Sequence, residues 1–201
     1  MGLRYVALGD SYTIGTSVTP GERWPNQLVT RLATGGESRL DLVANLGVNG
    51  YTSRDVIIAE LPRLPELLPE FASLLVGVND VVQGVAAETF RANAQVIVDR
   101  LLTHVPRNRL VVVSTPDYTV TPRGTSYGDP AKQSAAIRQN NGIIAELARA
   151  QSIAYVDIFD LSLAARDDLS LVADDGLHPS GRQYRLWVDL IAPVVGQLLA
   201  S

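Results

Sequence analysis

Five short apolar runs, separated by longer segments of a different character, constrain the fold of this chain more than any other feature. The runs are rich in Val, Leu and Ile and lie at residues 5–8, 40–44, 72–76, 110–114 and 154–156. They are too short for ordinary helices, and near-continuous hydrophobicity without alternation is typical of strands buried on both faces of a parallel sheet. Since periodicity alone does not distinguish such strands from buried helix fragments, the segments between them decide.

Those intervening segments have the periodicity of helices. Apolar residues recur at steps of three and four along four of them, which span residues 24–32, 88–105, 131–150 and 184–198. We expect Pro193 to kink or split the last of these helices, because it removes the hydrogen bond to the carbonyl of Asp189.

Alternation of strand and helix, repeated about five times, implies right-handed crossovers between parallel strands. The sequence therefore predicts an α/β fold, a three-layer α/β/α sandwich with a five-stranded parallel sheet of the flavodoxin-like kind. The chain has 201 residues and no Gly-, Ser- or Pro-rich linker, so residues 1–201 are expected to form a single domain. Ligands of such open sheets bind outside the carboxyl ends of the strands.

Composition limits the partners and the location. A net charge of −4 without clustered Lys and Arg offers no surface for nucleic acid. The lack of cysteine excludes disulfides, thiolate catalysis and Cys-based zinc sites. No apolar run approaches the ~18 residues of a membrane span, and the first residues are too short and interrupted for a secretory signal. We expect a cytoplasmic protein, although a removed export signal would leave no trace, and the oligomeric state is not readable.

Four polar motifs follow the predicted strands or lie near the C-terminus. They read GDSY at residues 9–12, NLGVNG at 45–50, GVND at 77–80 and DDGLHP at 174–179. Because parallel strands end at one edge of the sheet, we expect these motifs to converge there.

Acyl transfer by a serine requires a base and a third group that orients the base. The chain has two histidines, His104 and His178. His104 lies at the end of a predicted helix, where a histidine most simply interacts with unpaired carbonyls. His178 has Asp175 three residues upstream, and Ser11 directly follows the first strand. Ser11, His178 and Asp175 are therefore the candidate catalytic residues.

An oxyanion hole requires donors aimed at the developing negative charge. The Ser11 N–H, the Gly50 N–H and the Asn79 side-chain amide are candidates, because each lies in one of the motifs. Taken alone, each also has a structural interpretation, as a turn glycine or a capping asparagine.

Together the four motifs resemble the sequence blocks of SGNH hydrolases, the GDSL-type esterase and lipase family, in order and over residues 5 to about 190. The resemblance implies that Ser11 is the nucleophile, that His178 is the base and that Asp175 is its carboxylate. It also implies that Gly50 and Asn79 complete the oxyanion hole. No cofactor or metal is implied, and the expected partner is a small-molecule ester.

The chain departs from the family pattern beside these residues. Tyr12 replaces the common leucine after the nucleophile, and Asn49 and Tyr51 flank Gly50. Both tyrosines are expected either to line an acyl pocket or to pack against a helix. Gly47 is a rival for the second-block glycine, but the spacing from the start of the block favours Gly50.

Other motif residues have simpler interpretations. Asp10 and Asn45 are expected to hold loops through side-chain to backbone bonds. Asp174 is a rival of Asp175, but only Asp175 has the family's spacing to the histidine. The polar stretch 116–132 is either a functional loop or a solvated connection.

These observations favour a serine ester hydrolase that forms an acyl-enzyme. Aromatic residues make up only 6% of the chain and no apolar lid is evident, which favours a short acyl group such as acetyl. Lysophospholipase- and thioesterase-type acylhydrolases are the alternatives within the family. A metal-dependent phosphoesterase would need several ligands, usually including multiple histidines. A flavodoxin-like phosphate- or flavin-binding module is the alternative of a different class, supported by the hydroxyls of residues 11–17 but by no phosphate-loop or dinucleotide motif.

Overall fold

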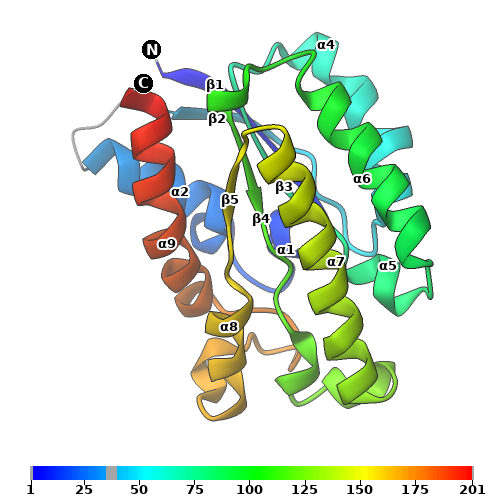
Figure 1. Ribbon diagram of the computed structural model, residues 1–201. Helices are drawn as coiled ribbons and strands as arrows, with labels where there is room; N and C mark the ends of the chain where they lie inside the picture. Colours follow the sequence, from blue (N-terminus) through cyan, green and yellow to red (C-terminus); the bar gives the residue numbers. More distant parts are fainter. Residues whose placement is uncertain (1, 35–39, 201) are drawn as a thin grey trace.

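A five-stranded parallel sheet forms the centre of the molecule (Figure 1), and the computed structural model describes residues 2–34 and 40–200. The strands are β1 (Leu3–Gly9), β2 (Leu40–Asn45), β3 (Phe71–Leu75), β4 (Leu110–Val113) and β5 (Ala154–Val156). Their order is β2-β1-β3-β4-β5, and every neighbouring pair is parallel. All five predicted strands are confirmed. Of the predicted single domain, residues 1, 35–39 and 201 lie outside the described part.

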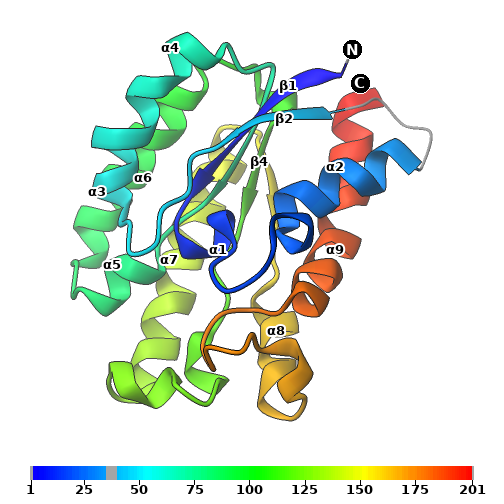
Figure 2. The same cartoon turned by 180° about the vertical axis from the view of Figure 1, so that it is seen from behind.

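Helices cover both faces of this sheet, as Figures 1 and 2 show from opposite sides. One face is covered by α2 (Trp24–Thr34) and α9 (Gly181–Ala200). The other face is covered by α6 (Ala87–Leu101), α7 (Pro130–Ala150) and a helical stretch of α3 (Ser53–Asp55), a π-helical turn (Val56–Glu60), a 3₁₀ turn (Leu61–Arg63) and α4 (Leu64–Leu67). The three-layer α/β/α architecture is therefore confirmed.

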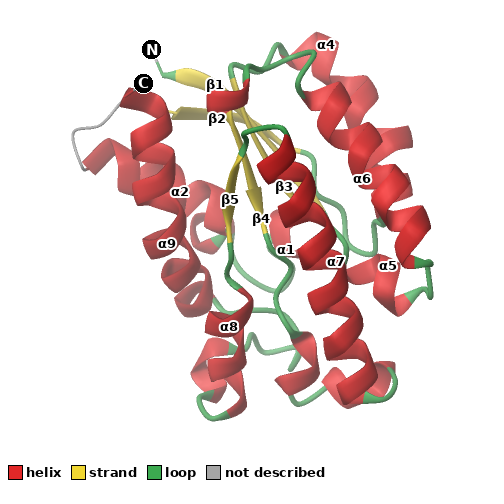
Figure 3. Ribbon diagram, viewed as in Figure 1, coloured by secondary structure: helices red, strands yellow, loops and turns green. Residues whose placement is uncertain are grey.

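Short helical elements fill the connections at one end of the sheet. They are α1 (Ser11–Ile14), α5 (Val78–Val82), α8 (Phe159–Ser162) and 3₁₀ turns at Pro20–Glu22, Tyr118–Val120, Gly124–Tyr127, Leu163–Arg166 and Leu169–Leu171, whereas the 3₁₀ turn at Arg107–Arg109 precedes β4 at the opposite end. Of these, α1 and α5 directly follow the carboxyl ends of β1 and β3 (Figure 3), so that the first and third motifs lie at one edge of the sheet.

The core explains why the strands carry no alternation of apolar and polar residues. Along β1, Tyr5 and Ala7 pack in the cluster beneath α2 and α9, whereas Val6 and Leu8 pack in the cluster beneath α6 and α7. All four are fully buried. Since both faces of the strand are covered by helices, every position is apolar.

Of the two outcomes predicted for Pro193, a kink or a split, the split is wrong, because α9 is one helix that runs through this residue. Ile191 and Val195 are fully buried on either side of it and hold the helix against the sheet. Pro193 and Asp189 are both exposed, so that the carbonyl freed by the proline can bond to water. Packing of the buried face outweighs the loss of one hydrogen bond.

No helix in the described part of the chain is both long enough and apolar enough to cross a membrane.

Candidate active site

The turn from β1 into α1 places Ser11 at the edge of the sheet. Gly9 has φ +148°, and a Cβ there would lie 2.0 Å from the Leu75 carbonyl oxygen, so only glycine fits. Asp10 caps α1, accepting the Tyr12 N–H on Oδ1 at 3.0 Å. Ser11 is the first residue of α1, and its N–H has no acceptor among the described residues.

Asp175 and His178 form a short polar pair in the cavity that Ser11 also lines. His178 Nδ1 lies 2.6 Å from Asp175 Oδ2, and the backbone N–H groups of Leu177 and His178 each donate to Asp175 Oδ1 at 2.9 Å. Ser17 Oγ donates to Oδ2 at 2.7 Å. With Nδ1 bonded to the carboxylate, Nε2 is the nitrogen left to exchange a proton with a substrate or nucleophile.

Hydrogen bonding keeps Asp175 ionised. Partial burial favours the neutral carboxyl, but the hydrogen bonds from His178, Ser17 and the backbone of Leu177 and His178 outweigh it and hold the pKa of Asp175 well below its usual range. Asp174 makes none of these contacts and lines a different cavity. Of the two aspartates, Asp175 is the one that the structure brings to the histidine.

A cavity of about 250 Å³ brings most of the predicted site residues together. Ser11, Asn79, Asp175 and His178 all line it. No hydrogen bond joins Ser11 Oγ to the His178 ring in the part of the chain that the structure describes. Catalytic hydrogen bonds are often long before substrate binds and tighten in the complex.

Tyr12 lines the same cavity and packs against the base. Its ring contacts the His178 ring edge-on, with centroids 5.8 Å apart, and contacts Trp187 of α9 at 6.2 Å. Tyr12 is therefore both a cavity wall and part of the core. Tyr51 does not line the cavity, but its carbonyl accepts a hydrogen bond from Asn79.

The second and third motifs meet through side-chain bonds to the backbone. Asn79 Nδ2 donates to the Tyr51 carbonyl at 2.9 Å, and Gln83 Nε2 donates to the Gly50 carbonyl at 3.2 Å. An amide nitrogen carries two hydrogens, so Asn79 retains one donor for the cavity. The N–H of Gly50 has no acceptor among the described residues.

The two glycines of the second motif have different roles. Gly50 adopts φ +86°, and a Cβ there would meet open space, so its conformation and not crowding requires glycine. At Gly47 a Cβ would lie 2.7 Å from the Asp10 carbonyl oxygen and 2.7 Å from the Ile14 nitrogen. The Gly47 N–H donates to Asn45 Oδ1 at 3.1 Å. Gly47 therefore serves close packing, and Gly50 is the glycine with a free donor.

Asn45 also confirms its expected structural role, since its Nδ2 donates to the Thr13 carbonyl at 2.7 Å and so holds the loop to α1. Asp80, the last residue of the third motif, accepts the N–H and hydroxyl of Ser53 at 2.9 and 2.5 Å. Asn93 donates to the same hydroxyl at 2.9 Å. The prediction missed Ser53 and Asn93, which lie outside the four motifs.

A third missed residue is Glu60, which is buried beneath the nucleophile turn. Its Oε2 accepts the Gly9 N–H at 2.9 Å. Burial raises the pKa of Glu60 to about 9 and that of Asp10 to about 8, although in each case a backbone N–H bond opposes the shift. The other oxygen of each carboxyl has no hydrogen-bond partner in the described residues. A charged side chain inside the apolar stretch VIIAEL was the available signal.

The stretch 116–132 forms a wall of the cavity and is not a simple solvated connection. Tyr118, Arg123 and Tyr127 of this stretch line the cavity, and the two tyrosine rings contact each other with centroids 5.5 Å apart. α7 begins within the stretch, at Pro130.

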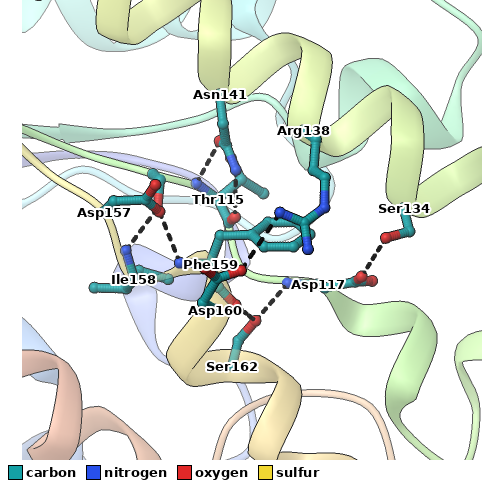
Figure 4. Close-up of polar contacts among 11 residues, drawn as sticks. Thr115, Asp117, Ser134, Arg138, Asn141, Asp157, Ile158, Phe159, Asp160 and Ser162 are labelled. Atoms are coloured by element: carbon teal, nitrogen blue, oxygen red, sulfur yellow. Dashed lines mark hydrogen bonds and ion pairs between the residues drawn. The ribbon is translucent and has the colours of Figure 1, made fainter.

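Hydrogen bonds anchor the start of this wall to α7 and α8 (Figure 4). The Asp117 N–H donates to Ser162 Oγ at 2.8 Å, and Ser134 Oγ donates to Asp117 Oδ2 at 2.6 Å. Thr115 exchanges two bonds of 2.8 Å with the Asn141 side chain. The backbone that leads to Tyr118 and Arg123 is thus held from two helices.

His104 lies in the turn between α6 and β4, at the opposite end of the sheet from the cavity. The expected contact between its ring and helix-end carbonyls is not made in the described structure; its backbone N–H bonds to the Leu101 carbonyl at 2.9 Å instead. Among residues 2–34 and 40–200, no three acidic or histidine side chains gather as a metal site would require.

Comparison with known proteins identifies the family and the fold of the chain. A model of the GDSL-like Lipase/Acylhydrolase family matches residues 7–186. A lipase/acylhydrolase from Enterococcus faecalis is 21% identical with a TM-score of 0.74, over 97% of this chain and 96% of that chain. The acetylxylan esterase Axe2 from Geobacillus stearothermophilus is 18% identical with a TM-score of 0.75, over 97% and 94%. TesA is 19% identical with a TM-score of 0.76, over 97% and 99%. No curated protein matches the sequence.

Proposed function

Since this chain belongs to the GDSL-like lipase/acylhydrolase family and is a carboxylester hydrolase, we propose that it works through a Ser11–His178–Asp175 triad. The observation that carries the proposal is the 2.6 Å bond from His178 Nδ1 to Asp175 in the cavity that Ser11 also lines. A histidine oriented by an ionised carboxylate and open at Nε2 can act as a general base toward a serine in the same cavity.

In the first stage His178 Nε2 accepts the hydroxyl proton of Ser11 while Ser11 Oγ attacks the ester carbonyl carbon. Asp175 stays ionised and stabilises the imidazolium that forms, which its low pKa permits. The tetrahedral intermediate collapses as the alcohol leaves with the proton from His178. The product of this stage is an acyl-enzyme on Ser11.

The oxyanion of the intermediate is held by the N–H groups of Ser11 and Gly50 and by the second amide hydrogen of Asn79. Support comes from the lack of protein acceptors for these two backbone N–H groups in the described residues. The bond from Asn79 to the Tyr51 carbonyl orients the amide before substrate arrives, so no reorganisation is needed during the reaction.

In the second stage water attacks the acyl-enzyme, with His178 again as the base, and releases the acid and the free Ser11 hydroxyl. The chemistry needs no metal or cofactor. The cavity of about 250 Å³ is at the small end for ligand sites, and this favours a short acyl group such as acetyl over a long chain. The whole chain is proposed to act as one domain, because the two large apolar clusters pack on opposite faces of the same sheet.

Hydrolysis of 4-nitrophenyl esters from acetyl to dodecanoyl, without added metal, tests this proposal. We expect wild-type protein to cleave the short esters best and Ser11→Ala to lose turnover by about 10⁶-fold, down to background, while its thermal unfolding stays that of wild type. Activity that survived in Ser11→Ala would contradict the triad. A preference for long acyl chains would overturn the short-acyl assignment and favour the lysophospholipase- or thioesterase-type alternative.

A further inference from the structure

We propose that Arg123 selects esters that carry a negatively charged group, an inference that rests on the proposed esterase function and specifies its substrate class. Arg123 is the one lysine or arginine among the residues that line the catalytic cavity. It lies on the wall formed by stretch 116–132, in the turn between the two tyrosines Tyr118 and Tyr127. The shape of the site therefore brings one cation to the place where the ester binds.

The guanidinium of Arg123 has no carboxylate partner within ion-pair distance in the described structure. Its side chain makes one polar contact there, a 3.4 Å bond from Nη1 to the Asp175 carbonyl oxygen, which is long for a hydrogen bond. The Asp175 carboxylate forms no ion pair with the guanidinium, and its oxygens accept from His178, Ser17 and Leu177 instead. The fork of N–H donors on Arg123 is left to face the cavity and solvent.

The backbone that carries Arg123 is fixed relative to the triad. The Arg123 N–H donates to the Gly176 carbonyl at 2.9 Å, and Gly176 follows Asp175 in the chain. The aliphatic stem of Arg123 lies over the same turn, since a Cβ on Gly176 would come within 3.3 Å of Arg123 Cγ. Gly124 packs so closely that a Cβ there would lie 2.3 Å from the Tyr118 carbonyl oxygen. The backbone on both sides of Arg123 is thus held in place.

A guanidinium presents paired donors that match carboxylate, phosphate and sulfonate groups. A neutral ester forms no charge-assisted bond with such a group, whereas an ester that carries an anionic group on its acyl or alcohol portion does. Because Arg123 is exposed at the rim, the gain is at the low end of such bonds, about tenfold in kcat/KM.

Matched ester pairs locate the anion. One pair places it on the leaving group, 4-acetoxybenzoate beside methyl 4-acetoxybenzoate. The other places it on the acyl group, 4-nitrophenyl hydrogen adipate beside 4-nitrophenyl methyl adipate. We expect Arg123→Gln to lower kcat/KM about tenfold for the charged ester of one pair and less than about twofold for both neutral esters, with Arg123→Lys between. High salt should reduce the difference.

Arg107→Gln is the control for net charge, because Arg107 precedes β4 at the opposite end of the sheet. It should leave all four esters unaffected. Equal losses on charged and neutral esters in Arg123→Gln would assign Arg123 to support of the Asp175 turn, and no loss on either charged ester would give it no role; both overturn the inference.

A binding measurement tests the role of Arg123 independently of the proposed triad. Calorimetry of the same esters with Ser11→Ala protein, with and without Arg123→Gln, reads anion preference without turnover. An Arg123-dependent preference in binding sustains the inference even if no ester is cleaved, and equal binding of charged and neutral esters contradicts it.

Discussion

Two groups of carboxyls lie around the candidate nucleophile, and they differ in charge state for a physical reason. Asp175 is partly exposed and accepts hydrogen bonds from one imidazole, one hydroxyl and two backbone N–H groups, and its pKa is lowered. Asp10 and Glu60 are buried, each accepts one backbone N–H, and their pKa values are raised to about 8 and about 9. The number of donors and the access to water, and not closeness to Ser11, decide which carboxyl is ionised at pH 7.

This partition suits the chemistry proposed for the site. An anion at Asp175 stabilises the imidazolium that His178 becomes in the transition state. An anion at Asp10, the residue before Ser11, would instead repel the oxyanion that develops near the Ser11 N–H in a region of low dielectric. Neutral carboxyls on the nucleophile side and an ionised one on the base side therefore place charge only where the reaction can use it.

Among the tests of this contrast between the carboxyls, the largest effect is expected from removing Asp175, the ionised one. We expect Asp175→Ala to lower kcat on 4-nitrophenyl acetate about 10⁴-fold, since the imidazole loses both its orientation and its countercharge. Asp174→Ala is the matched control, and should change kcat less than about twofold because Asp174 makes no contact with the histidine. Equal losses in the two variants would refute the assignment of Asp175.

A smaller loss of kcat is expected when Asn79, a proposed donor to the oxyanion, is removed or replaced by an anionic side chain. Asn79→Ala removes one proposed donor and should lower kcat by about 10²- to 10³-fold. Asn79→Asp keeps the size of the side chain but replaces the donor by an acceptor that is ionised at pH 7, so it should lower kcat at least as much. Steady-state kinetics on 4-nitrophenyl acetate measure both, with thermal unfolding as the check on folding. Wild-type kcat in Asn79→Asp would show that the amide is no oxyanion donor.

The two groups of carboxyls also differ in how far they are predictable from sequence. Asp175 lies three residues from His178, so a local motif identifies the pair. The contact of Glu60 with Gly9 spans 51 residues and depends on a π-helical turn in a stretch that has no clear helical period. Arg123 likewise meets the site only through a long loop whose path is set by bonds to α7 and α8. Strands and motif residues follow from local pattern, whereas these contacts arise from tertiary packing.

Pro193 also shows a limit of prediction from local sequence, because here tertiary packing overrides a local rule. Its local rule predicts a kinked or split helix, and the burial of Ile191 and Val195 keeps α9 continuous. A local rule holds where tertiary packing is neutral and fails where packing contributes more free energy than the one lost hydrogen bond.

The smallest expected effect concerns stability, and it tests whether the buried group is neutral. In the folded state the pKa of Glu60 is about 9, above its ordinary value of 4.5, so the folded protein binds the additional proton between these two pH values. The free energy of unfolding therefore falls as pH rises through this window, by up to about 1.4 kcal/mol per pH unit from this group. Glu60→Gln keeps an oxygen to accept the Gly9 N–H but has no proton to lose.

We expect Glu60→Gln to make this decline with pH shallower, so that it gains up to about 1 kcal/mol of stability relative to wild type for each pH unit within the window. Urea unfolding at a series of pH values measures it, with Glu66→Gln as the matched control, because Glu66 is exposed on the neighbouring helix α4. An unchanged slope in Glu60→Gln would mean that Glu60 is ionised in the folded state. Asp10, which is completely buried in the turn before Ser11, would then be the one neutral carboxyl in the contrast with Asp175.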